Sequence, residues 1–151
     1  LYTYWKRTAP PPNMMAFDAP NREVCTIARG NTTTPLQALV TLNDPQFVEA
    51  ARVFAERMLN QQGNEEVKLR WAFLESTSRE PKPAELKVLQ AALERERKRY
   101  AANAKAAEAT LSVGEAPKDP KITAKFTPAE QAAWMQVAVI ILNLSETVTR
   151  N

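Results

Sequence analysis

Residues 127–148 read TPAEQAAWMQVAVIILNLSETV, and this stretch decides the fold. Its first residues carry a helix start signal: Thr127 can cap, Pro128 takes the first helical position, and Glu130 can reach back to the cap. Apolar residues then recur at helical spacing, through Trp134, Val137, Ile141, Leu144 and Val148. Because further apolar residues occupy its other faces, the stretch predicts a buried central helix over residues 128–148.

The same proline signal occurs three more times, at Thr34-Pro35, Asp44-Pro45 and Lys82-Pro83. Together with apolar spacing, it predicts helices over residues 35–42, 45–62 and 83–111, and a further helix over residues 65–77. No stretch shows the strict alternation of a strand, and only three glycines occur. The sequence therefore predicts an all-α fold, an antiparallel helical bundle. Its core is expected to combine four residues of the closing helix with three aromatic residues, namely Trp134, Val137, Ile141 and Leu144 with Phe47, Phe54 and Trp71.

The remaining segments are expected to be irregular, apart from residues 1–8, which resemble the tail of a helix. Prolines at four positions make residues 9–33 a long irregular segment, and residues 112–126 form a polar loop. The helix over residues 83–111 would reach roughly 40 Å, so it could protrude as an arm. Because the chain opens on Leu1 and a cluster of aromatic residues, we expect one helical domain over residues 1–151 that is a fragment of a larger domain.

Composition excludes several classes of site. The 151 residues are 44% hydrophobic and 25% charged, as in a soluble globular protein, and contain no histidine. Histidine-based catalytic triads and histidine metal sites are therefore excluded from this chain. The single cysteine, Cys25, is expected to be a small buried hydrophobic residue between Val24 and Ile27 rather than a nucleophile. The sequence contains no recognisable catalytic constellation, glycine-rich phosphate loop or metal-ligand spacing, so we expect no cofactor and leave enzymatic activity open.

Charge is nearly balanced, with 20 Lys and Arg against 17 Asp and Glu. The basic residues Arg95, Arg97, Lys98 and Arg99 alternate with glutamates, which is typical of a solvated helix face rather than a nucleic-acid interface. The most apolar run, residues 134–144, is too short to span a membrane. We therefore expect neither a nucleic-acid partner nor a membrane span.

The densest group of polar residues lies between Asp18 and Asp44, in the irregular segment and first short helix. Two interpretations stay open for it. The residues can satisfy the backbone of the segment and cap its helices, or they can form one wall of a binding site. The candidate polar cluster consists of Arg22, Glu23, Arg29, Asn43 and Asp44.

Three stretches carry a resemblance to a known family: LYTYWKRTAPPPNMMAFDAPNREVC, TPLQALVTLNDPQFVEAARVFAERM and AAWMQVAVIILNLSETV. Over roughly residues 1–60 and 126–150, the chain resembles the C-terminal domain of unknown function of planctomycete multidomain proteins. Residues 62–125 match mainly in being helical. The family's domain extends further upstream, so the chain resembles its C-terminal half.

The resemblance implies an extracytoplasmic protein, periplasmic or at the cell surface, whose neighbours include cytochrome-c-like and lectin-like modules. It implies no haem in this chain, because the Cys-x-x-Cys-His attachment pattern is absent. Our first hypothesis is a non-catalytic helical interaction module that packs against the upstream half of its domain and against neighbouring domains. The alternative is part of a carbohydrate-active or carbohydrate-binding domain that the upstream half completes, with a polysaccharide as partner.

Overall fold

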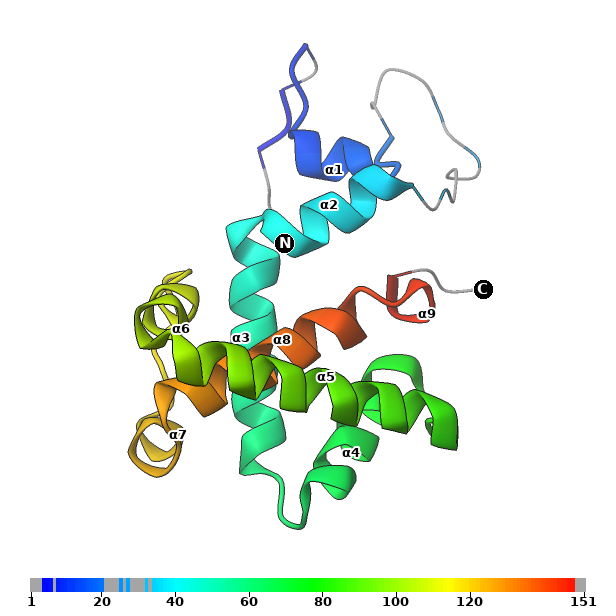
Figure 1. Cartoon of the computed structure of the whole chain (residues 1–151). Coiled ribbons are helices and arrows are strands. Elements are labelled where there is room, and N and C mark those ends of the chain that lie inside the picture. Colours follow the sequence, from blue (N-terminus) through cyan, green and yellow to red (C-terminus); the bar gives the residue numbers. More distant parts are fainter. Residues whose placement is uncertain are drawn as a thin grey trace.

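The computed structural model describes residues 4–6, 8–20, 25, 27, 32 and 34–148 of the chain (Figure 1). Within these residues there are helices and no strand, so the expected all-α fold is confirmed. The helices are α1 (Pro12–Ala16), α2 (Pro35–Asn43), α3 (Pro45–Asn60), α4 (Glu65–Thr77), α5 (Pro83–Ala102), α6 (Ala104–Leu111), α7 (Pro120–Lys125), α8 (Pro128–Leu142) and α9 (Ser145–Val148).

Proline sets the starts of four helices, as the sequence predicts, and a side chain caps three of them. Helices α2, α3, α5 and α8 begin at Pro35, Pro45, Pro83 and Pro128. The Thr127 hydroxyl accepts the Glu130 N–H at 3.3 Å, at the start of α8. Each cap satisfies one of the backbone donors that a helix leaves unpaired in its first turn.

Helix α8 forms the centre of the molecule, and it packs against α3, α5 and α6. Figure 1 shows α5 and α8 running in opposite directions beside each other, while α3 crosses them. Trp134, Val137 and Ile141 are buried, together with Phe54 of α3. The central helix therefore begins where the sequence places it, but it ends at Leu142 and does not continue to residue 148, since residues 145–148 form the separate helix α9.

Two members of the expected core are placed differently. Leu144 is only partly buried, because α8 ends at Leu142 and a turn leads into α9. Phe47 is 37% exposed, because it lies in the first turn of α3. The ring of Phe17 packs on it, with 5.7 Å between the two ring centroids. Trp71 packs partly buried against the core, with its ring 5.8 Å from that of Phe54.

The expectation of one long helix over residues 83–111 is wrong. The predicted helix is interrupted at Asn103. The Asn103 side chain accepts the N–H of Ala106 at 3.1 Å and so starts α6. Helix α6 folds back onto α8, where Ala107 and Leu111 are buried. Burial of these two side chains explains the break, since a straight helix would carry them away from the core.

Three irregular segments also differ from expectation. Residues 4–6 and 8 are not helical, so in its described part the N-terminal segment is no helix tail. The segment 9–33 contains the short helix α1, and the loop 112–126 contains α7. Ile122 of α7 is 2% exposed, so this loop contributes to the core.

Candidate functional site

The candidate polar cluster is only partly within the described residues. Arg22, Glu23 and Arg29 lie outside them, so the cluster as a whole stays a prediction. The Asn43 amide donates to the Leu39 carbonyl at 2.8 Å. One Asp44 oxygen accepts the Gln46 N–H at 2.9 Å, which caps α3, and the other accepts from Asn13 Nδ2 at 3.4 Å. Both side chains thus engage their own segment.

Asp18 links two positions of the irregular segment that lie 14 residues apart. Its carboxylate accepts the Thr32 hydroxyl at 2.7 Å and the Thr32 N–H at 2.8 Å. These two hydrogen bonds, the hydroxyl first, hold the pKa of Asp18 below its usual value. Asp18 also has a φ of 55°, a left-handed conformation that aspartate tolerates better than most residues.

The expected burial of Cys25 is wrong. Cys25 is exposed, and so is the neighbouring Ile27. The other apolar flank, Val24, lies outside the described residues.

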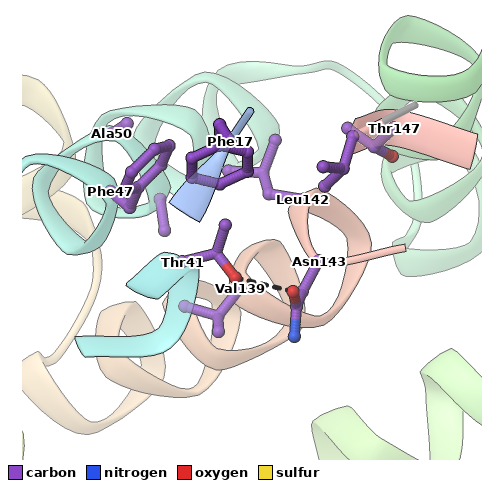
Figure 2. A pocket seen from close by; sticks show the side chains of 10 residues that line it. Phe17, Thr41, Phe47, Ala50, Val139, Leu142, Asn143 and Thr147 are labelled. Carbon is purple, nitrogen blue, oxygen red and sulfur yellow. Dashed lines mark hydrogen bonds between the residues drawn. The ribbon is translucent and has the colours of Figure 1, made fainter. Parts of the chain in front are cut away.

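An apolar pocket of about 350 Å³ lies where α1, α2, α3 and α8 meet (Figure 2). Phe17 follows α1, Thr41 belongs to α2, and Phe47 and Ala50 belong to α3. Figure 2 shows Val139 and Leu142 of α8 on the other walls of the pocket, with Asn143 directly after them. The sequence predicts none of these residues as site residues, and it predicts Phe47 as a core residue.

One hydrogen bond links two walls of this pocket. The Thr41 hydroxyl donates to Asn143 Oδ1 at 2.6 Å, across 102 residues of sequence (Figure 2). Asn143 is the C-cap of α8, so the bond fixes α2 on the end of the central helix. The same hydroxyl also lies 2.9 Å from the Ala38 carbonyl of its own helix.

A second pocket of about 440 Å³ adjoins the first. Phe17 and Phe47 line both, so this ring pair separates the two spaces. The second pocket is the more polar one, because the amide side chains of Asn13 and Gln46 reach it beside Trp5.

Helix α2 exposes its three leucines and buries a polar side chain. Leu36, Leu39 and Leu42 are 56%, 57% and 45% exposed. Gln37 is 5% exposed, and its side-chain oxygen accepts the Thr34 N–H at 3.2 Å. We call these three leucines the leucine face. Their spacing of three residues was visible in the sequence, but helical spacing alone does not show which face is covered.

Two arginine networks join helices elsewhere. Arg97 pairs with Glu65, Glu94 and Glu130 at 2.5–2.7 Å, and these bonds, chiefly that of Glu130, raise its pKa. Burial by itself raises the pKa of Glu130, but hydrogen bonds from Arg97 and the Trp134 indole outweigh it and lower the pKa. In the second network, Arg79 pairs with Glu85 and Glu146. The guanidinium groups of Arg97 and Arg79 are therefore engaged in structural contacts.

Among the described residues, no group of acidic or cysteine side chains is arranged to hold a metal ion. In the same part of the chain, no helix combines the length and apolar character needed to cross a membrane.

A family model matches residues 1–93, and its description reads PSD1, protein of unknown function (DUF1553). The match includes α1 to α4 and half of α5. It therefore contains the part of the first pocket that α2 and α3 line, and the residues from α1 and α3 that line the second. No curated protein and no solved structure matches the chain.

Proposed function

We propose, from the premise that the chain belongs to the PSD1 (DUF1553) family of proteins of unknown function, that it is a non-catalytic helical interaction module. In this proposal it forms the C-terminal half of a domain in a larger extracytoplasmic multidomain protein of the planctomycete type. Its partner is the preceding part of the same polypeptide, which docks on the leucine face.

The leucine face carries this proposal. A helix in a single-domain protein normally turns its leucines inward, but α2 turns Leu36, Leu39 and Leu42 outward while Gln37 is buried. Contiguous exposed apolar side chains mark interaction surfaces. Residues 4–6 lie at the same end of the molecule as α1 and α2, so a preceding segment would enter beside this face (Figure 1).

Thermal unfolding of the double variant L36E/L39E tests the proposal in two contexts. In the 151-residue chain, we expect little change in Tm, because both leucines already face solvent. In the full-length polypeptide, we expect Tm to fall by several degrees, because burying one leucine contributes about 1.5–3 kcal/mol.

The matched control is V88E, at an exposed apolar residue of α5. It should leave Tm nearly unchanged in both contexts. If L36E/L39E and V88E behave alike in the full-length polypeptide, the leucine face is not a docking surface.

The extracytoplasmic location rests on the resemblance of roughly residues 1–60 and 126–150 to the planctomycete domain. Fractionation of cells that express the tagged full-length protein tests it. We expect recovery in the periplasmic or surface fraction, and recovery with cytoplasmic markers would contradict the proposal.

The second pocket favours one further candidate function, carbohydrate binding. Sugars pack on aromatic rings and hydrogen-bond to amides, and this pocket places Trp5 and Phe47 beside Asn13 and Gln46. A polysaccharide panel screened with the full-length protein tests this candidate. Q46A should weaken any binding found, while Q62A, at an exposed residue outside the pocket, should not. A panel without a binding polysaccharide would remove this candidate.

A further inference from the structure

We infer that the apolar pocket binds a small, uncharged, largely apolar molecule with one or two rings. This inference goes beyond the proposed docking role and uses none of the three leucines. It rests on how the pocket is built, on the chemistry of its walls and on its size.

The fold builds the pocket before any ligand arrives. Its walls come from α3 and from α8, which are packed on each other in the core, and from α2, which the Thr41–Asn143 bond holds in place. Thr147 and Val148 of α9 close one end. A site whose walls are held by the core costs little ordering on binding.

The chemistry of the walls selects an uncharged ligand. None of the described residues that line the pocket is charged, and most contribute carbon atoms only. Three polar side chains line the pocket: Thr41 and Asn143 bond each other at 2.6 Å, and the Thr147 hydroxyl donates to the Ile141 carbonyl at 2.9 Å. A charged group would lose its water here and find no counter-charge among these described lining residues, which is costly.

The size of the pocket sets the size of the ligand. Its volume of about 350 Å³ lies at the lower end of the range for small-molecule sites. An engineered apolar protein cavity of about 150 Å³ holds benzene, so this space accommodates one or two rings. Phe17 and Phe47 offer ring faces and edges against which an aromatic molecule packs.

An NMR titration of the chain with indole tests the inference. We expect saturable shifts of the methyl groups of Val139, Leu142 and Val148, which line the pocket. Indole-2-carboxylate has the same rings with a negative charge, and it should bind at least about tenfold more weakly.

Two matched variants locate the site. Ala50 is exposed at the rim of the pocket, so A50F can fill it from the surface and should weaken indole binding at least about tenfold. Ala91 is an exposed alanine of α5 away from the pocket, and A91F should change the affinity by no more than about twofold.

Three outcomes would overturn the inference: no shift of the three methyl groups, shifts that persist in A50F, or equal binding of the carboxylate. The variant L36E/L39E should bind indole as wild type does. Failure of the docking proposal and failure of this inference are therefore distinguishable.

Discussion

At the scale of single residues, Arg52 is the most unusual side chain of the core. It is 2% exposed, donates to Glu56 at 2.7 Å and to the Ala116 carbonyl at 2.6 Å. The second bond attaches the segment after α6 to the middle of α3. A buried guanidinium is stable only with such partners. The bond to the Ala116 carbonyl therefore holds the segment after α6 against α3.

Removal of these bonds should destabilise the fold. We expect R52A to lower the free energy of unfolding by about 3–5 kcal/mol, because it leaves the mostly buried Glu56 carboxylate unpaired. R70A, on α4, removes exposed pairs with Glu66 and Glu80 and should cost less than about 1 kcal/mol. Urea denaturation measures both, and equal losses would contradict the structural role of Arg52.

Ile141 gives a second prediction at this scale. It is fully buried in α8, so I141A should lower the free energy of unfolding by about 2–5 kcal/mol. V88A truncates an exposed side chain and should cost less than about 0.5 kcal/mol. Chemical denaturation that shows a loss below about 0.5 kcal/mol for I141A would mean that α8 is not central.

At the scale of elements, Asn103 separates α5 from α6 and lets α6 fold back. Its side chain caps α6, so N103A should lower the free energy of unfolding by about 0.5–2 kcal/mol. E108A removes an exposed side chain of the same helix and serves as the control. If N103A unfolds at the same urea concentration as wild type, the packing of α6 alone determines where the helix is interrupted.

The starts of α2, α3 and α8 could be predicted from the sequence because each is written locally, as a proline behind a capping side chain. The break at Asn103 could not, because the apolar stripe through Tyr100, Ala107 and Leu111 continues across it. Periodicity reports which residues share a face, but not where a helix bends back onto a partner.

The pockets could not be predicted for a related reason. Their walls come from several elements, and Thr41 meets Asn143 only because α2 docks on the end of α8. In the sequence these two residues appear as interruptions of apolar helices. Arg22, Glu23 and Arg29 lie outside the described residues, so the candidate polar cluster stays a prediction.

At the scale of the whole molecule, Arg79 joins α5 and α9 to the end of α4. It pairs with Glu85 of α5 at 2.7 Å and with Glu146 of α9 at 2.8 Å. Hydrogen bonds, first from Arg79 and then from the Lys82 N–H, lower the pKa of Glu85 to about 2. Arg79 likewise lowers the pKa of Glu146.

This network predicts a pH dependence. Because the pKa of Glu85 is lower in the folded than in the unfolded chain, its stabilisation is complete above the unfolded pKa and is lost as pH falls towards about 2. Urea midpoints should therefore fall between roughly pH 5 and pH 2. E85Q should show a smaller fall over this range, while E108Q, at an exposed residue of α6, should follow wild type. Equal profiles for E85Q and wild type would contradict this role.

The folding unit is larger than the part that the family model matches. Residues 1–93 contain α3 and half of α5, but both pack on α8, which lies outside the match. We expect a chain of residues 1–93 to show no cooperative urea transition, whereas residues 1–151 should show one. A cooperative transition of the shorter chain would contradict the central role of α8.

The position of α8 also has a consequence for biosynthesis. On the ribosome, α3, α4 and α5 are made before the helix that covers their apolar faces. Leu142 follows Ala102 by 40 residues, which corresponds to roughly 2–8 s of translation. During this interval the nascent helices expose their core side chains and are substrates for chaperones. The core of this protein can therefore form only after α8 has been synthesised.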